Sequence, residues 1–214
     1  MSEAPEIVAR MPANAGAGVH SAVNPSDDAG GILPVRRRNR LRDYDYSREG
    51  AYFVTVCARN RAAVFGRIVG ANCVRPLAAG VPPRVELSAL GRIVKDETDA
   101  LHRAYPMVRV DKSVVMPNHV HLLMTIEFQS DGGRTQFAPT VGAPTVSRIV
   151  KQWKGVISKR AGFSPWQKSF HDHVIRNQND FDCIAEYIEN NPVLWNQDCF
   201  FVEASADETG GVNI

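Results

Sequence analysis

The chain has 214 residues, 44% of them hydrophobic and 22% charged, which is ordinary for a soluble globular protein. Because the formal net charge is only +2, an argument for nucleic-acid binding must come from where the basic residues lie, and they gather in the middle of the chain. Four widely spaced cysteines without a C-x-x-C pair argue against a disulfide framework or a zinc ribbon, and no apolar run is long enough to span a membrane, so we expect a cytoplasmic protein.

Both ends of the chain are expected to be disordered. The first 35 residues are small, polar and rich in glycine, proline and aspartate, and they show no hydrophobic periodicity. The tail over 201–214 has the same character. We therefore expect a disordered segment over 1–35, one folded domain over 36–200 and a disordered tail over 201–214.

The first half of the domain reads as a strand followed by a helix. Tyr52 to Cys57 is a β-branched and aromatic run that is typical of a buried strand. An irregular loop is expected from Cys73 to Pro83, after which Ser88 caps a helix. One face of that helix carries Leu90, Ile93, Val94 and Leu101.

Two strands and a second helix are predicted next. Met107 to Val115 and His119 to Glu127 are strand-like, and the Pro117-Asn118 turn between them suits a hairpin. A linker follows over 129–143, and Pro144 and Thr145 then open a helix. Its core-facing stripe consists of Val146, Ile149, Val150 and Trp153.

A short extended piece from His173 to Arg176 precedes the last helix. This helix runs from about Asn179 to Asn191 and ends there because Pro192 lacks an amide proton. The order is strand, helix, strand, strand, helix, strand, plus one extra helix. It predicts an α+β fold of the ferredoxin-like type, an antiparallel sheet with helices on one face, to which a C-terminal tyrosine-bearing helix is added.

Two histidines on the predicted strand 119–127 are candidate metal ligands. Side chains alternate along a strand, so His119 and His121 share one face, about 7 Å apart at their Cα atoms. The core then receives Val120, Leu122 and Met124. Such a pair alone also fits two hydrogen-bonded strand histidines that bind nothing, so a metal site needs a third ligand.

Tyr187 and Asn191 stand one turn apart on the last helix, whose core-facing stripe consists of Phe181, Ile184, Ala185 and Ile188. Taken alone, Tyr187 also fits a half-buried structural tyrosine, and Asn191 a helix-ending residue. A phenol with a pKa of about 10 is a poor nucleophile at neutral pH unless a cation assists it. Two imidazoles and one amide oxygen would hold Mg²⁺ or Mn²⁺ and leave positions for phosphate oxygens.

Two motifs resemble those of the REP-associated tyrosine transposases, which are single-tyrosine transposases with a His-hydrophobic-His motif. The segment MPNHVHLL, from Met116 to Leu123, is similar to that histidine motif, and YIENNPV, from Tyr187 to Val193, is similar to the tyrosine-helix motif. The segment WQKSFHDHVIR, from Trp166 to Arg176, and the first strand are similar as well. The resemblance covers about residues 40–195.

The resemblance implies an enzyme, a metal-dependent endonuclease and strand transferase that acts on single-stranded hairpin DNA of the repetitive extragenic palindrome type. Tyr187 would attack a phosphodiester and leave a covalent 5′-phosphotyrosine and a free 3′-hydroxyl. His119 and His121 match the paired metal ligands. Asn191 matches the third ligand, which is glutamine in many insertion-sequence relatives, and Asn190 is the second choice. Mg²⁺ or Mn²⁺ would be the cofactor, and the protein would be a monomer or a homodimer.

Basic residues offer a surface for the phosphates of DNA. The predicted contacts are a basic arm of Arg36, Arg37, Arg38, Arg40 and Arg42, and the helix face of Arg148, Lys151 and Lys154. The resemblance adds His173 and Arg176. Each charge cluster also fits a solvated face, and Trp153, at a core-stripe position, is expected to pack.

Two other functions stay open at this point. One is a nucleic-acid-binding regulator that does not cut, with Tyr187 structural and the histidines without an ion, in which case chelation would not affect binding. The other is a zinc hydrolase, in which His119, His121, His171 and His173 would form one site.

Overall fold

The structure is a computed structural model, and it describes residues 44–70, 82–128 and 144–202. The strands are β1 (Gly50–Cys57), β2 (Gly66–Val69), β3 (Arg84–Leu87), β4 (Val108–Val115), β5 (His119–Ile126) and β6 (His171–Val174). The helices are α1 (Ala89–Asp99), α2 (Leu101–Ala104), α3 (Val146–Ala161) and α4 (Gln178–Asn190). Two short 3-10 helices, η2 (Arg59–Arg61) and η3 (Trp195–Gln197), complete the elements of these ranges.

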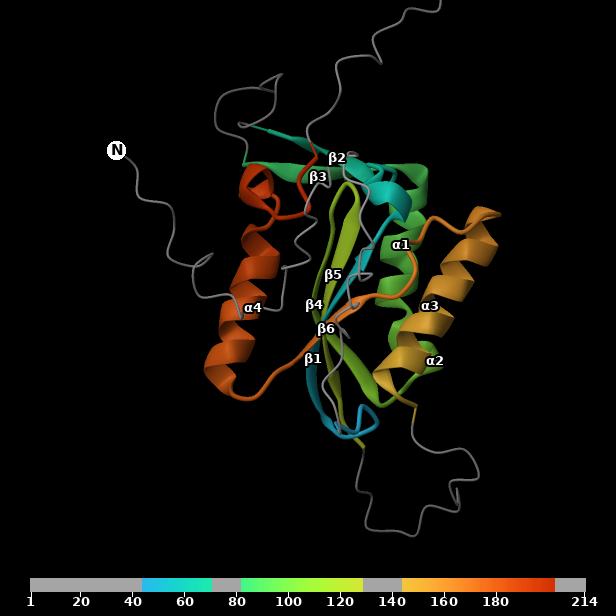
Figure 1. Cartoon of the computed structure of the whole chain (residues 1–214), viewed down its shortest axis with the longest axis vertical. Helices are drawn as coiled ribbons and strands as arrows, with labels where there is room; N and C mark the ends of the chain where they lie inside the picture. Colours follow the sequence, from blue (N-terminus) through green and yellow to red (C-terminus); the bar gives the residue numbers. More distant parts are fainter. Residues whose placement is uncertain (1–43, 71–81, 129–143, 203–214) are drawn as a thin grey trace, which may run out of the picture.

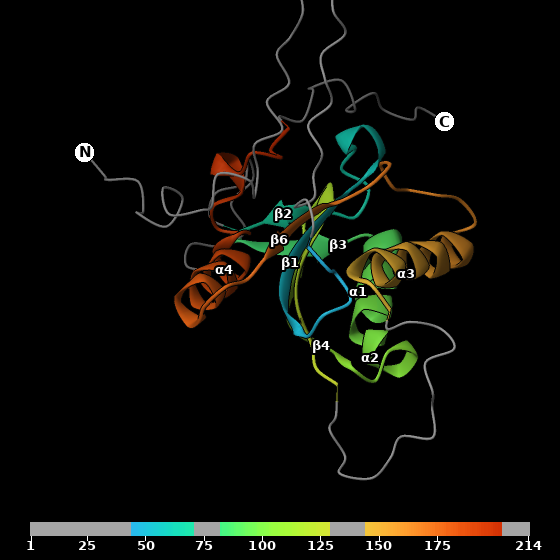
Figure 2. The same cartoon turned by 60° about the horizontal axis from the view of Figure 1, so that its bottom comes forward.

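The main sheet has the strand order β4-β5-β1-β6, and every neighbouring pair is antiparallel. Each of the helices α1 and α3 connects two strands that are not neighbours, which is the split β-α-β arrangement. Figures 1 and 2 show α1, α2 and α3 on one face of this sheet and α4 on the other. The predicted ferredoxin-like α+β fold with an added C-terminal helix is therefore confirmed.

Alternation along β1 and β5 divides the sheet into two apolar faces. The face toward α1 and α3 carries the fully buried side chains Tyr52, Val54, Val56, Val120, Leu122 and Met124. The predicted stripe of α3 packs on this face, and Trp153 is 3% exposed, as expected of a core residue. Most of the stabilising apolar burial lies in this layer.

The opposite face forms a second, smaller core with α4. It consists of Phe53, Leu123, Ile184 and Ile188, with Phe181, Ala185 and Tyr187 packed around it. Because α4 presents this stripe to the sheet, the side chains at the edge of the stripe lie over the same strand face as His119 and His121.

Both predicted helix caps are confirmed. Ser88 Oγ accepts a hydrogen bond from the Gly91 amide (3.0 Å), and Thr145 Oγ1 accepts one from the Arg148 amide (3.3 Å). Within the described ranges, no helix has the length and apolar character needed to cross a bilayer.

Several predicted boundaries differ from the structure. The first helix ends at Asp99, so Leu101 belongs to the separate turn α2, and the predicted strand 173–176 begins two residues earlier, as β6. The hairpin of β2 and β3 was not predicted, because four-residue strands are too short to show a period. The segments 1–35 and 129–143, most of the tail and most of the predicted loop after Cys73 lie outside the described residues.

Gly91 marks a close approach that the fold depends on. A Cβ atom there would lie 1.9 Å from the backbone oxygen of Phe65, which also accepts a hydrogen bond from the Ser88 amide. We expect Gly91→Ala to lower the free energy of unfolding by about 2–3 kcal/mol in urea titrations. The control is Gly155→Ala on α3, where no atom lies within 4 Å of the added Cβ and alanine is the better helix former. Equal effects of the two substitutions would contradict this explanation.

Candidate metal and nucleophile site

The candidate site lies at the start of β5, on the face of the sheet that α4 covers. His119 pairs with Cys57 and His121 with Thr55 across β1, so both imidazoles leave the sheet on the same side. Figure 1 shows the C-terminal end of α4 and the turn between β4 and β5 at the same end of the sheet. Both histidines are 0% exposed, and their Nε2 atoms lie 2.9 Å apart. The predicted shared face is confirmed.

Asn118, in the turn before β5, determines which ring nitrogen of His119 carries the proton. Its amide nitrogen donates to the carbonyl oxygens of Arg61 (3.2 Å) and Phe200 (2.8 Å), so Oδ1 is the atom that faces His119 Nδ1, 2.9 Å away. An amide oxygen can only accept, so Nδ1 of His119 carries the proton and Nε2 keeps its lone pair. This lone pair is the one that a metal ion requires.

Thr55 and Phe53, both on β1, contact the imidazole of His121. Thr55 Oγ1 lies 2.9 Å from His121 Nδ1, and its oxygen can accept a hydrogen bond from Nδ1–H. The Phe53 ring lies 5.2 Å from the imidazole, centroid to centroid. Burial lowers the pKa of His121 to about 4, and burial lowers the pKa of His119 well below its usual range. Both rings are therefore neutral at neutral pH, the form that binds metals.

Tyr187 reaches this pair from α4. Its hydroxyl lies 3.4 Å from His121 Nε2 and donates a hydrogen bond of 3.0 Å to Asp198 Oδ2. Its ring stands edge-on against Phe53, with 6.2 Å between the centroids. Burial raises the pKa of the Tyr187 hydroxyl far above its usual value, and the charge of Asp198 raises it further. The phenol is therefore protonated in this arrangement.

Asn191, the predicted third ligand, lies inside the same cluster. Its side chain is 1% exposed, and its Nδ2 donates to Asp198 Oδ2 over 2.8 Å. Its Oδ1 is buried and has no hydrogen-bond partner among the described residues. Asn190, the second choice, is only partly buried, and its carbonyl accepts the amides of the turn after α4. The geometry thus favours Asn191 of the two.

Asp198 is a site residue that the sequence motifs missed. It follows η3, and its carboxylate gathers Tyr187, Asn191 and, at 4.0 Å, His119 Nε2. Candidate ligand atoms of His119, His121 and Asp198 all lie within 4.8 Å of one another. An aspartate in an irregular stretch after a proline carries no periodic signal. The signal that was present is an acidic residue directly before the apolar run Cys199 to Val202.

The segment 195–202, called the C-terminal segment below, covers His119. The ring centroids of Phe200 and Trp195 lie 4.7 Å and 5.8 Å from that of His119. On its other side this segment is held by Arg61, whose guanidinium lies 5.4 Å from the Phe200 ring and donates to the Cys199 carbonyl over 3.4 Å. The cluster is thus enclosed by aromatic rings.

The donor set fits a divalent cation. Ligand atoms about 2.1 Å from one octahedral ion lie about 3–4 Å from one another. The two Nε2 atoms are 2.9 Å apart, and Asp198 Oδ2 lies 4.0 Å from His119 Nε2. The orphaned Oδ1 of Asn191 is a further buried acceptor that a cation would satisfy. Imidazole nitrogens with carboxylate and amide oxygens suit a metal ion of this class.

The predicted DNA-contacting residues do not lie together in the structure. The basic arm from Arg36 to Arg42 lies outside the described residues. The predicted contacts Arg148, Lys151 and Lys154 lie on α3, across the sheet from Tyr187. Arg148 and Lys151 are exposed. The Lys154 ammonium donates to the carbonyl oxygens of Gln167 (2.8 Å) and Ser169 (2.9 Å), so this side chain has a structural role besides the DNA contact predicted for it.

His173 and Arg176 lie near the N-terminal end of α4, not beside Tyr187. His173 Nε2 lies 3.0 Å from Asp180 Oδ2, and the backbone amide of Arg176 donates to the same oxygen. His171 is nearer the site, because it pairs with Thr55 and its ring lies 6.5 Å from that of Phe200. Among the described residues, the possible metal-binding group joins His119 and His121 to Asp198 without His171 or His173, so the four-histidine zinc site is wrong.

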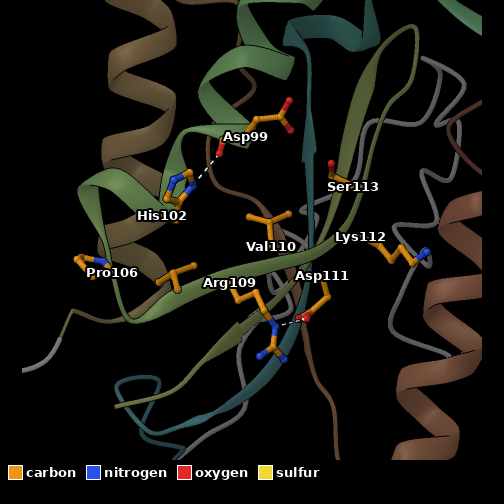
Figure 3. Close-up of a pocket in the computed structure, with 9 residues that line it drawn as sticks. Asp99, His102, Pro106, Arg109, Val110, Asp111, Lys112 and Ser113 are labelled. Atoms are coloured by element: carbon orange, nitrogen blue, oxygen red, sulfur yellow. Dashed lines mark hydrogen bonds and ion pairs between the residues drawn. The ribbon is translucent and has the colours of Figure 1, made fainter. Parts of the chain in front are cut away.

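A pocket of about 470 Å³ lies elsewhere, beside the edge strand β4. It is lined by Asp99, His102, Pro106 and the residues from Val108 to Ser113. In Figure 3, Arg109 turns toward Asp111, and His102 toward the carbonyl of Asp99. Because Arg109 and His102 already have partners within this pocket, the histidine–tyrosine cluster remains the candidate site.

Comparison with known proteins gives similarities in sequence and in structure. No protein-family model matches the chain. An uncharacterised protein of Haemophilus influenzae is 33% identical over 181 residues, covering 78% of this chain and 94% of the relative. A REP-associated tyrosine transposase bound to a REP hairpin is 20% identical, with a TM-score of 0.49, over 82% of this chain and 98% of that chain. A candidate transposase of Deinococcus radiodurans is 18% identical, with a TM-score of 0.35, over 71% and 95%.

Proposed function

This chain belongs to the same protein family as the uncharacterised protein of Haemophilus influenzae, and we propose that it is a metal-dependent endonuclease and strand transferase of the tyrosine-transposase type. Its substrate is single-stranded hairpin DNA resembling a repetitive extragenic palindrome. One observation carries the proposal. The Tyr187 hydroxyl lies 3.4 Å from His121 Nε2, inside a cluster of neutral imidazoles and buried oxygens that suits a divalent cation.

Tyr187 performs the chemistry. Its phenolic oxygen gives its proton to water and forms a bond to phosphorus, while the bond from phosphorus to the 3′-oxygen breaks. The 5′-phosphate remains on Tyr187, and the 3′-oxygen takes a proton from water and leaves as a free hydroxyl. Attack of that hydroxyl, or of another, on the phosphotyrosine reverses the step, so the bond energy is kept for strand transfer.

His119, His121 and Asn191 would hold Mg²⁺ or Mn²⁺. When bound, the ion supplies positive charge that stabilises the attacked phosphate and favours the phenolate of Tyr187. The chain's own residues determine the orientation. Asn118 and Thr55 direct the two Nε2 lone pairs into the site, and α4 places the phenol beside them.

The DNA phosphates bind to basic side chains. We assign this role to Arg36, Arg37, Arg38, Arg40 and Arg42, to Arg148, Lys151 and Lys154 on α3, and to His173 and Arg176 near the start of α4. Since α3 lies across the sheet from Tyr187, its basic residues would hold the hairpin stem or flank rather than the cleaved bond. The protein acts in the cytoplasm as a monomer or a homodimer.

The test of the proposed function is whether the protein forms a covalent adduct with DNA. Purified protein is incubated with end-labelled hairpin DNA and Mn²⁺, and the mixture is separated under denaturing conditions. We expect a labelled protein–DNA band that EDTA prevents. Binding of the hairpin that is unaffected by EDTA, with no adduct and no cleavage, would instead identify a regulator that does not cut.

Asn118 should control the metal affinity although it is not a ligand. Asn118→Ala removes the acceptor that keeps the proton of His119 on Nδ1, and it removes the hydrogen bond to the Phe200 carbonyl. We therefore expect the Mn²⁺ affinity, measured by calorimetry, to fall by about 10–100-fold. The control is Asn179→Ala on the exposed side of α4. An Asn118→Ala protein that is folded and binds Mn²⁺ as tightly as the wild type would refute this role.

A further inference from the structure

The carboxylate of Asp198 is buried without a countercharge. Its side chain is 1% exposed, and the nearest ionisable partner is His119, whose Nε2 lies 4.0 Å from Oδ2. No lysine or arginine of the described ranges forms an ion pair with it. Moving a carboxylate out of water is costly unless an opposite charge compensates for it.

Hydrogen bonds satisfy the oxygens of Asp198 without cancelling its charge. Oδ2 accepts from the Tyr187 hydroxyl and from Asn191 Nδ2, and Oδ1 accepts from the Phe200 amide over 2.6 Å. Oδ2 also lies at the edge of the histidine pair, at a distance from His119 Nε2 that two ligands of one ion can have. The oxygen is therefore placed both to orient the nucleophile and to meet a cation.

We infer that Asp198 is an anionic ligand of the cation and that cation binding fastens the C-terminal segment over the site. This inference rests on the proposed function, since it adds a ligand to the site proposed there. The hydrogen bond to Asp198 sets the orientation of the Asn191 amide. Because its Nδ2 is bound to Asp198, its unpaired Oδ1 must face away from that carboxylate.

The C-terminal segment comes close to the histidines at two points. Asp198 contributes its carboxylate, and Phe200 accepts a hydrogen bond from Asn118, which in turn orients His119. A cation bound by both His119 and Asp198 would therefore link β5 to this segment. The segment would loosen when the cation is removed.

The first test compares Asp198→Asn with the wild type for binding of Mn²⁺ by calorimetry, using the full chain. We expect the asparagine protein to lose at least about tenfold in affinity, because the negative ligand is gone while the shape is kept. The control is Asp182→Asn, an exposed carboxylate on α4 that bonds to Gln178, and its affinity should equal that of the wild type. Unchanged or higher affinity in Asp198→Asn would overturn the inference.

A melting experiment separates a ligand from a merely structural residue. Without metal, Asp198→Asn should melt close to the temperature of the wild type, because removing a buried negative charge offsets the loss of one hydrogen-bond acceptor. With saturating Mn²⁺, the wild type should gain more in melting temperature than the variant. A variant that melts lower without metal, yet gains as much with Mn²⁺, would show a structural role and overturn the inference.

Hydrogen exchange of the wild type needs no substitution. Residues 195–202 should exchange more slowly with Mn²⁺ than with EDTA, and equal exchange would contradict the fastening of this segment.

The proposed function and this inference fail in different ways. If the wild type binds no Mn²⁺, the metal site of the proposed function is wrong and the inference falls with it, whereas equal binding by the wild type and Asp198→Asn refutes the inference alone.

Discussion

Replacing Tyr187 with phenylalanine should abolish the covalent protein–DNA adduct and lower the rate of hairpin cleavage by about a thousandfold or more. The reason is chemical, since the ring can keep its edge-on packing against Phe53 while the oxygen that attacks phosphorus is absent. The hydrogen bond to Asp198 is also lost, which costs about 1–3 kcal/mol and should leave the protein folded. Single-turnover cleavage of labelled hairpin DNA in Mn²⁺ measures the effect.

Tyr105→Phe is the matched control for this substitution. Tyr105 is also buried and its hydroxyl donates to Gln152, but it packs in the core on the α1 and α3 face. We expect this variant to form the adduct at the rate of the wild type. An adduct in the Tyr187→Phe protein, or its loss in both variants, would contradict the assignment of the nucleophile.

Replacing both His119 and His121 with alanine should eliminate Mn²⁺ binding and reduce cleavage by about a thousandfold or more, while hairpin affinity changes only a few-fold. The DNA affinity persists because basic side chains elsewhere supply it. The two imidazoles contribute the neutral nitrogens of the site, and alanine offers no ligand in their place. Calorimetry with MnCl₂ and a filter-binding assay with hairpin DNA measure the two affinities separately.

The control for the histidines is His102→Ala. His102 is exposed on α2 and bonds only to the nearby Asp99 carbonyl among the interactions described, so neither affinity should change. Thermal melting checks that the double variant is folded, since both lost rings are buried. Tight Mn²⁺ binding by the folded double variant would move the metal site away from β5, and loss of DNA binding would show that these histidines shape the DNA surface.

The parts of the site that could be predicted from the sequence are those with a local period. Alternation along β5 puts His119 and His121 on one face and Leu122 on the other, whatever the neighbouring strands are. The helical stripe of α4 likewise directs Tyr187 toward the sheet. The fold class followed from the order of such elements, because few topologies accommodate it.

Contacts between distant segments could not be predicted in this way. Asp198 and Phe200 belong to an irregular stretch after α4, and only tertiary packing shows that they meet His119 and Asn118. The Pro117-Asn118 pair predicts a turn, which the structure has, but the role of Asn118 in orienting His119 depends on the carbonyls of Arg61 and Phe200. Neither partner is near it in sequence.

The side of the sheet on which a charged helix lies also depends on tertiary packing and could not be predicted from periodicity. Periodicity correctly placed Arg148 and Lys151 on the exposed side of α3. It did not show that α3 and α4 lie on opposite faces of the sheet, which Figures 1 and 2 show. It also did not show that Lys154 ties α3 to the loop before β6 through two carbonyls.

Crystals grown with Mn²⁺ would test the shared cation most directly, through the anomalous signal of the metal. We expect one strong peak bonded to the Nε2 atoms of both His119 and His121, with the Tyr187 hydroxyl close enough to attack a phosphate held there. A site without a peak under saturating Mn²⁺, or a peak bound only by other residues, would contradict the convergence of histidines and tyrosine on which the proposed activity depends.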